Sequence, residues 1–191
     1  MNFCLHGSAR TVKEAVARAQ HAETLGFEAI FFADSQMNNV DPYQAMAMCA
    51  LNTKTIRFGT AVTNMVYRDP TITASSYATL NEISQGRAIV GMGTGDGPVY
   101  SLGRTATKLA EFEKGLRVIR DLLHDRGVDV PRSKERKGRK KIWTCWGNPP
   151  VIARPVNLQL STYAGALTGL PTHADMDSQA GYYETDQADR H

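Results

Sequence analysis

A strand-and-helix rhythm in the first 125 residues constrains this chain more than any other feature. Segments with the composition of buried strands occupy residues 2–6, 28–33, 57–62 and 87–92, so their starts lie 26, 29 and 30 residues apart. Consecutive βα units take about 30 residues each. The runs FEAIFFA and RAIVGM are almost wholly apolar, which is typical of strands covered on both faces of a parallel sheet. The spacing therefore predicts an α/β fold with four parallel strands in the order 1-2-3-4.

The segments between these strands carry helix start signals. Thr11 and Glu14 have the spacing of a capping box, and the dipeptides Asp41-Pro42 and Asp69-Pro70 each place a side-chain acceptor ahead of a proline. Both patterns are typical of helix N-termini. A fourth helix with a single apolar stripe is predicted after residue 108. The stripe consists of Leu109, Phe112, Leu116, Ile119 and Leu123.

The rhythm stops near residue 130, which divides the chain into three parts. Residues 1–130 hold the strand–helix units, residues 131–141 form a basic loop, and residues 142–191 form an irregular or partly disordered tail. The run at 132–141 has seven basic residues and one acid, which leaves 15 of the 22 basic and 18 of the 19 acidic residues elsewhere. Because this run has no interleaved aromatic residues, we interpret it as a solvated loop and expect no nucleic-acid binding.

Composition argues against several other protein classes. No apolar run approaches the ~18 residues of a membrane span, and the N-terminal segment lacks the apolar region of a secretory signal. The three cysteines lie far apart without a Cys-x-x-Cys pair, which argues against a zinc site or a disulfide framework. We therefore expect a cytoplasmic protein that does not bind membranes.

Polar residues follow the predicted strands, at the edge where parallel α/β proteins bind their ligands. His6 ends the first strand, and Asp34 and Ser35 end the second. His6 could serve a ligand or be a satisfied structural residue. Asp34 could accept from a ring N–H or cap the next turn. Thr63 and Asn64 end the third strand, and they could bind a ligand edge or form a turn.

A glycine-rich run, GMGTGDG, follows the fourth strand. Its alternating glycines suit the close approach of a flat or anionic ligand. Asp96 stands where a dinucleotide fingerprint needs its third glycine, and no Gly-Lys-Ser/Thr follows, so the run is neither that motif nor a P-loop. The sequence also lacks a Ser-His-Asp arrangement, a metal-ligand pair and a Gly-x-Ser-x-Gly elbow. We therefore expect a bound cofactor to supply the chemistry.

Three motifs together resemble the luciferase-like flavin-dependent oxidoreductases. They are VTN-x-x-x-R-D-P with a following Thr-Ala, the I-S-x-G-R-A run that leads into G-x-G-x-G-D, and L-G-R ahead of Thr107-Lys108-Leu109. In order and spacing they are most similar to the methylenetetrahydromethanopterin reductase branch, which uses the deazaflavin coenzyme F420. The resemblance covers roughly residues 2–128.

This resemblance implies a TIM-barrel-type fold that binds FMN or coenzyme F420 across the C-terminal face of the strands. It also implies a non-proline cis peptide at Ala61–Val62 that supports the ring, with Thr63 and Asn64 beside it. The expected cofactor-binding residues are Asp34, Ala61, Val62, Thr63, Asn64, Gly93, Thr94 and Gly95.

Two departures from the family pattern limit what the resemblance implies. Deazaflavin-dependent sugar-phosphate dehydrogenases have Asp-His at the end of strand two, whereas this chain has Asp34-Ser35, so that histidine's catalytic role is not carried over. His6 and Ser35 are left as the candidate catalytic residues. The family has eight βα units and only four are legible here. The chain is a half-barrel, a truncated reading frame or a sequence with a frame-shifted tail.

We expect a flavin- or deazaflavin-dependent oxidoreductase or monooxygenase that acts on a small organic substrate. The alternative is a non-catalytic half-barrel that binds flavin weakly or self-associates. Four strands leave two open sheet edges, and the inward side chains of Phe3, Ile30, Phe32 and Ile89 would face a missing half. We therefore expect a homo-oligomer.

Overall fold

The structure is a computed structural model that describes residues 3–124, 126–131 and 139–142. The chain divides into two units, Met1–Ser161 and Thr162–His191, and every described residue lies in the first. Apart from Ile142, the expected irregular tail lies outside the described residues. Within the described ranges, no helix is both long enough and apolar enough to cross a membrane.

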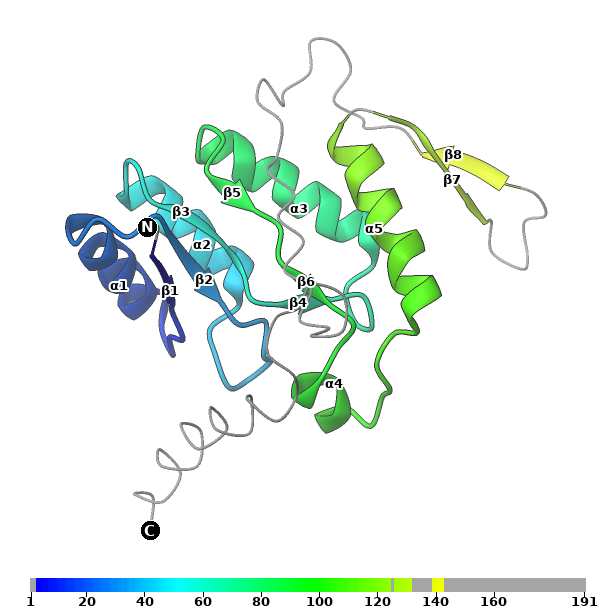
Figure 1. Cartoon of the computed structure of the whole chain (residues 1–191), viewed down its shortest axis with the longest axis horizontal. Helices are drawn as coiled ribbons and strands as arrows, with labels where there is room; N and C mark the ends of the chain where they lie inside the picture. Colours follow the sequence, from blue (N-terminus) through cyan, green and yellow to red (C-terminus); the bar gives the residue numbers. More distant parts are fainter. Residues whose placement is uncertain (1–2, 125, 132–138, 143–191) are drawn as a thin grey trace. The chain divides into compact units, whose positions relative to one another are not determined.

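Four parallel strands form the central sheet (Figure 1). They are β1 (Cys4–His6), β2 (Ala29–Phe32), β3 (Arg57–Thr60) and β5 (Ala88–Ile89). Each strand pairs in parallel with the next, in the order β1-β2-β3-β5. This confirms the predicted order 1-2-3-4, although every strand is shorter than predicted.

The third and fourth predicted strands are each broken into two short pieces, which the sequence did not indicate. β4 (Thr63–Asn64) and β6 (Met92–Gly93) form a separate two-stranded parallel sheet. The Ala61–Val62 peptide between β3 and β4 is cis, as the resemblance implied. Between β5 and β6, a Cβ placed on Gly91 would overlap the carbonyl oxygen of Thr60. The breaks therefore take Thr63 and Asn64 out of the central sheet.

The helices between the strands lie beside one another in chain order (Figure 1). α1 spans Val12–Thr24, α2 spans Pro42–Asn52, α3 spans Pro70–Ile83 and α5 spans Leu109–Leu123. α1 packs on α2, α2 on α3, and α3 on α5. A short helix that was not predicted, α4 (Gly97–Ser101), follows β6.

The predicted N-caps are present on three helices. Thr11 Oγ1 accepts the Glu14 N–H at 3.1 Å, and the Glu14 carboxylate accepts the Arg10 N–H at 2.9 Å. Asp41 and Asp69 likewise accept backbone N–H groups in the first turns of α2 and α3, each directly before its proline. Side-chain acceptors at these positions satisfy N–H groups that have no partner within the helix.

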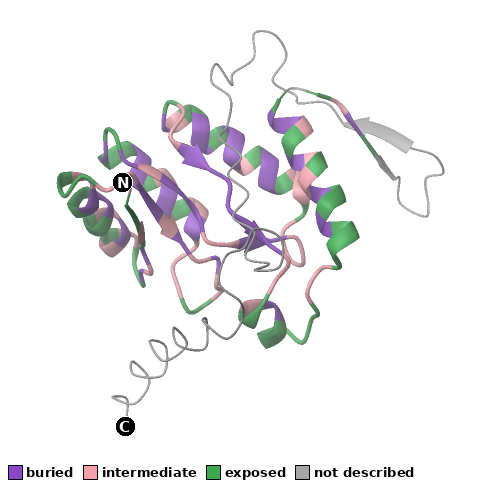
Figure 2. Ribbon diagram, viewed as in Figure 1, coloured by how far each residue is buried: buried purple, intermediate pink, exposed green. Residues whose placement is uncertain are grey.

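The core between sheet and helices corrects one expectation about side-chain direction. Figure 2 shows that the central strands are largely buried. Ile30 and Phe32 are 0% and 2% exposed and belong to the core cluster formed with the helices. Ile30 pairs with Phe58, which lies in the same cluster, and paired residues point to the same face of a sheet. Ile30 and Phe32 therefore face the helix layer, not the barrel interior. Ile89 is buried outside that cluster, and Phe3 is 62% exposed.

The buried face of α5 differs from the predicted stripe at its first position. Leu109 is 57% exposed. A Cβ on Gly115 would overlap the sulfur of Met65 and lie 3.2 Å from a ring carbon of Pro70. Because Met65 and Pro70 lie so close to Gly115, the face of α5 that carries Gly115 packs against the segment around α3. The buried residues of α5 are Phe112, Gly115, Ile119, Leu122 and Leu123.

An antiparallel pair of strands, which was not predicted, follows α5. β7 (Val128–Pro131) pairs with β8 (Arg139–Ile142). The two ends of the expected basic loop at 131–141 are therefore strand residues, because Pro131 ends β7 and Arg139 begins β8. Residues 132–138, which hold most of the basic run, lie outside the described residues.

Candidate functional site

Polar side chains from four segments meet at the C-terminal ends of β2 and β3. Asp34 follows β2, Asp41 and Tyr43 lie at the start of α2, Thr63 belongs to β4, and Arg68 precedes α3. We refer to these five residues as the Asp34 cluster. The sequence predicted two of them, Asp34 and Thr63, as site residues and did not predict a role in the site for the other three.

Asp34 is the buried acceptor of the cluster. Its side chain is 5% exposed, and Oδ2 accepts from Thr63 Oγ1 at 2.7 Å and from Arg68 Nε at 2.8 Å. An unpaired charge in a protein interior costs several kcal/mol, so a buried carboxylate needs such donors. Oδ2 of Asp34 is therefore occupied by protein groups, and it ties the end of β2 to β4 instead of capping the next turn.

Arg68 joins the two carboxylates of the cluster. In addition to its bond with Asp34, it donates from Nη2 to Asp41 Oδ2 at 2.8 Å. Its guanidinium carbon lies 4.3 Å from the centre of the Tyr43 ring, which is the geometry of a cation–π contact. Burial alone would lower the pKa of Arg68, but its hydrogen bonds with Asp34 and Asp41 raise that pKa overall. Arg68 therefore stays charged at physiological pH.

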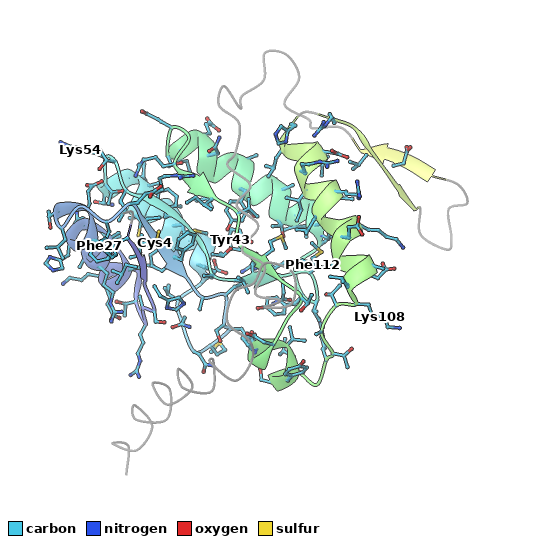
Figure 3. The ribbon with its side chains drawn as sticks, viewed as in Figure 1. Cys4, Phe27, Tyr43, Lys54, Lys108 and Phe112 are labelled. Atoms are coloured by element: carbon cyan, nitrogen blue, oxygen red, sulfur yellow. The ribbon has the colours of Figure 1, made fainter. Side chains whose placement is uncertain are left out.

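Two tyrosines lie behind the cluster. The side chain of Tyr43 (Figure 3) donates its hydroxyl hydrogen to Thr63 Oγ1 at 3.4 Å. Its ring meets that of Tyr77 edge-on, with 5.6 Å between the ring centres. The Tyr77 hydroxyl accepts the Thr60 N–H at 3.2 Å. Burial raises the pKa of Tyr43 to about 12 and the pKa of Tyr77 well above its ordinary value. Both hydroxyls are therefore protonated at neutral pH, and neither is poised as a general base.

Thr63 and Asn64, the two ligand candidates on β4, are buried. Thr63 is 0% exposed and Asn64 is 3% exposed. Thr63 donates its hydroxyl proton to Asp34, and Asn64 Oδ1 accepts the Val66 N–H at 3.0 Å. The Asn64 contact is a side-chain turn, one of the two roles that the sequence left open. Both side chains therefore hold the backbone of β4 in place.

Other predicted cofactor residues form a more accessible part of the same edge. Gly93 is buried in β6, and Gly95 has φ of +110°, which favours glycine. Four of the predicted cofactor-binding residues are partly exposed, namely Ala61, Val62, Thr94 and Gly95.

The two candidate catalytic residues take no part in these hydrogen bonds. His6 is exposed on β1, an edge strand, and Ser35 is partly exposed directly after Asp34. Within the described residues, neither side chain bonds to the Asp34 cluster. The same residues contain no group of three or more His, Cys, Asp or Glu side chains with the spacing of a metal site. The described residues at these strand ends are therefore better suited to binding a ligand than to nucleophilic or metal-assisted catalysis.

Arg68 is the functional side chain that the sequence reasoning most clearly overlooked. Its signal was its place in VTN-x-x-x-R-D-P, directly before the Asp69-Pro70 helix start. Tyr67 belongs to the same segment, and its hydroxyl donates to the backbone carbonyl of Asp34 at 2.5 Å. This segment therefore supplies three side chains that bond to Asp34 at the end of β2, namely Thr63, Tyr67 and Arg68.

A parallel βα sheet with its polar residues at the C-terminal strand ends is the architecture of TIM-barrel-type proteins. The described residues hold four strands of such a sheet and do not close a barrel. The chain belongs to the luciferase-like monooxygenase family, whose model matches residues 2–167. This match extends well beyond residues 2–128, where the motifs were recognised.

Curated reductases and solved structures are among the proteins to which the chain is similar. It is 47% identical over 152 residues to the 5,10-methylenetetrahydromethanopterin reductase of Methanolobus tindarius, covering 78% of this chain and 46% of that one. It is 38% identical over 149 residues to the Archaeoglobus fulgidus protein of that name, covering 75% and 45%. The coenzyme F420-dependent tetrahydromethanopterin reductase of Methanopyrus kandleri aligns with a TM-score of 0.60 at 28% identity, covering 65% of this chain and 40% of that one. The chain therefore spans about half the length of the curated relatives it matches.

Proposed function

We propose that this chain is part of an F420-dependent oxidoreductase that exchanges a hydride between the deazaflavin and a one-carbon group on a pterin-type substrate. The observation that carries the proposal is the 47% identity to a methylenetetrahydromethanopterin reductase across the segment that forms the strand ends. The proposal assigns the cofactor ring to the edge formed by Ala61, Val62, Thr94 and Gly95.

The residues at this edge fit a flat heterocycle. Ala61 and Val62 offer small and apolar side chains, and Gly95 has none, so a ring can approach the backbone closely. Asp34 and Thr63 lie buried behind the edge and bond to each other at 2.7 Å. A rigid backing of this kind preserves the orientation that hydride transfer requires.

A cation for the anionic tail of the cofactor lies beside the same edge. Arg104 belongs to the L-G-R motif, and its Nη1 donates to the backbone carbonyl of Val66 at 3.1 Å. Its side chain is exposed and has no ion pair among the described residues. We assign Arg104 to the phosphate of the tail, because guanidinium groups bind phosphate through paired hydrogen bonds.

The roles of this chain's residues follow from their positions. The deazaflavin supplies the hydride acceptor and donor when it is bound. Ala61 and Val62 support one face of the ring and exclude water from it. The Asp34 cluster positions β4, and the protonated tyrosines keep charge away from the ring. Ser35 and His6 are retained only as candidates for contact with the substrate.

Two alternatives are distinguished by the cofactor. The family description favours a monooxygenase, and we propose that such an enzyme would use FMN and oxygen on a small organic substrate. The other alternative is a non-catalytic half-barrel that binds flavin weakly or self-associates, because the described sheet has four strands and does not close. We further propose that the protein forms a homo-oligomer, because β1 and β5 are edge strands in the described sheet. We also propose a cytoplasmic location.

Titration of the purified chain separates these functions. Coenzyme F420 fluorescence and FMN fluorescence are each followed as protein is added. We expect saturable binding of F420 at least about tenfold tighter than binding of FMN, a difference of about 1.4 kcal/mol. Tighter binding of FMN would favour the monooxygenase alternative. Binding of neither would refute the proposal and leave the non-catalytic half-barrel.

A further inference from the structure

Gln36 connects the loop after β2 to α4. Its side-chain Nε2 lies 2.7 Å from the backbone carbonyl of Pro98 and 3.0 Å from Ser101 Oγ. These partners are 62 and 65 residues away in the sequence. Gln36 lies two residues beyond Asp34, and its partner Pro98 lies three residues beyond Gly95, which the proposed function assigns to the cofactor edge.

The orientation of this amide is fixed by its partners. The Pro98 carbonyl can only accept a hydrogen bond, so the amide nitrogen of Gln36 must be the atom that faces it. The Ser101 hydroxyl donates to the same Pro98 carbonyl at 2.8 Å, which leaves Ser101 Oγ to accept from Gln36. Exchanging the nitrogen and oxygen of the amide would place Gln36 Oε1 against the Pro98 carbonyl, which has no hydrogen to donate.

This orientation leaves the amide oxygen of Gln36 without a hydrogen bond to α4. Oε1 is buried and has no hydrogen-bond partner in the part of the chain that the structure describes. Buried acceptors in native proteins are nearly always satisfied, so this oxygen requires a donor from outside the described residues, and a ligand bound nearby can supply one. Because an amide oxygen only accepts, the missing group must be an N–H or O–H donor.

We propose that Gln36 Oε1 accepts a hydrogen bond from a ring N–H of the heterocycle bound at the strand ends, an inference that rests on the proposed function. Deazaflavin and pterin rings both carry such an N–H, so the shared chemistry is a heterocyclic amide donor. α4 holds the Gln36 nitrogen, which directs the oxygen before the ligand arrives. Gln36 is thus a binding residue, and Ser101 and Pro98 position it.

Substitutions at Gln36 separate the acceptor from the donor. Gln36→Lys keeps a donor for Pro98 and Ser101 but removes the acceptor. Gln36→Met removes both functions in a side chain of similar length, and it serves as the second variant if the lysine substitution disturbs the fold. Ser101→Ala is the matched control, because it weakens the connection to α4 and leaves Gln36 Oε1 intact. Thermal unfolding without ligand monitors the integrity of each variant.

The test measures the dissociation constants of coenzyme F420 alone and of methylenetetrahydromethanopterin in the presence of F420, by fluorescence titration. We expect Gln36→Lys and Gln36→Met to weaken one of the two ligands about tenfold, the effect of one lost hydrogen bond, and Ser101→Ala to stay within about twofold. The ligand whose affinity falls is the one whose ring N–H bonds to Gln36 Oε1. A lysine also attracts the anionic cofactor, so a loss of F420 affinity in Gln36→Lys cannot come from charge.

Three results would overturn the inference, and they differ in scope. If the unsubstituted chain binds F420 and both Gln36 variants bind the two ligands as tightly as it does, Gln36 Oε1 has no ligand role and the proposed function stands. If the unsubstituted chain binds neither ligand, the proposed function and this inference fail together. If only Ser101→Ala and Gln36→Met weaken binding, the connection to α4 matters and the acceptor does not.

Discussion

Arg68 donates its Nε hydrogen to Oδ2 of Asp34 at 2.8 Å, across 34 residues of sequence. The same oxygen accepts the Thr63 hydroxyl at 2.7 Å. One carboxylate oxygen therefore joins the end of β2, the start of β4 and the segment before α3. The position of β4 relative to the central sheet depends on this contact, because β4 pairs only with β6 among the described strands.

Replacing Arg68 with alanine is expected to destabilise the fold and weaken cofactor binding. The substitution leaves Asp34, which is 5% exposed, without its cationic partner. Removing one partner of a buried pair costs roughly 3–5 kcal/mol, and partial exposure of Arg68 places the expected loss at about 2–4 kcal/mol. Urea unfolding measures the loss, and F420 titration measures binding.

Arg117→Ala provides the control for this prediction. Arg117 pairs with Glu113 at 2.6 Å on α5, and the two side chains are 61% and 62% exposed. Pairs this exposed contribute little to stability because solvent screens them, so this variant should unfold close to the unsubstituted protein. Equal losses for Arg68→Ala and Arg117→Ala would contradict the role assigned to Arg68.

The central sheet was predictable because its signals are local. Runs of apolar residues, Asp-Pro helix starts and near-constant spacing all act within about 30 residues. The register that directs Ile30 and Phe32 to the helix layer is different, because it depends on pairing with β3. A strand that is apolar at every position gives no alternation from which its faces could be read.

The site was predictable only in part, for the same reason. Asp34, Thr63 and Asn64 are recognisable as polar residues at strand ends, but their burial is a tertiary property. In the sequence, Arg68 cannot be distinguished from other basic loop residues, because its contact with Asp34 exists only in the folded chain. β4 and β6 have two residues each, too few for any periodic pattern, and their break depends on the close approach of Gly91 to Thr60.

Substitution of Arg87 by lysine is expected to destabilise the protein, although the charge is kept. Nη2 donates to the Ala50 carbonyl at 2.7 Å, Nη1 to the Ile56 carbonyl at 2.9 Å, and Nε to the Ser84 carbonyl at 2.9 Å. A lysine cannot reach three separated carbonyls at once. With about 1 kcal/mol for each lost bond, we expect a loss of roughly 2–3 kcal/mol in urea unfolding.

Arg57→Lys tests whether this loss is specific to the geometry of Arg87. The nearest carboxylate oxygen of Glu28 lies 3.4 Å from Arg57 Nη1, and both side chains are partly exposed. We expect a change below about 0.5 kcal/mol. A similar loss for both lysine variants would indicate a general preference for arginine and refute the special role of Arg87.

Glu23 is expected to make stability depend on acid pH. Its Oε1 accepts the N–H groups of Lys54, Thr55 and Ile56 at 2.8, 2.6 and 2.9 Å. Burial alone would raise the pKa of Glu23, but these hydrogen bonds lower it from 4.5 to about 2. A depressed folded-state pKa means that the unfolded chain takes up the proton first, so the contribution is complete above pH 4.5 and is lost as pH falls toward 2.

Glu23→Gln isolates this contribution. After allowance for solvent screening, we expect the unsubstituted protein to exceed the variant by about 1–2 kcal/mol near pH 6. The difference should shrink in urea unfolding repeated at about pH 3. A difference that is the same at both pH values would show that the charge of Glu23 is irrelevant.

Asn64→Leu is expected to affect both stability and binding. The Val66 N–H loses its acceptor, and Asn64 is 3% exposed, so the loss of stability should be about 1–2 kcal/mol. Movement of β4 should also weaken F420 binding about tenfold, equivalent to about 1.4 kcal/mol. Asn52→Leu at the end of α2 is the matched control and should leave the affinity unchanged. Unaltered F420 binding by Asn64→Leu would exclude β4 from the site.

Substitution by alanine is expected to destabilise the protein strongly at one glycine of the run GMGTGDG and hardly at all at another. A Cβ at Gly91 would overlap the carbonyl oxygen of Thr60, and because this oxygen belongs to the backbone of β3 it cannot move aside as the end of a flexible side chain could. We expect Gly91→Ala to cost at least about 3 kcal/mol, the upper range for overpacking. At Gly97, in the first turn of α4, a Cβ would have no atom within 4 Å. Gly97→Ala should therefore change the free energy of unfolding by less than about 1 kcal/mol, and equal stabilities of the two variants would refute the packing role of Gly91.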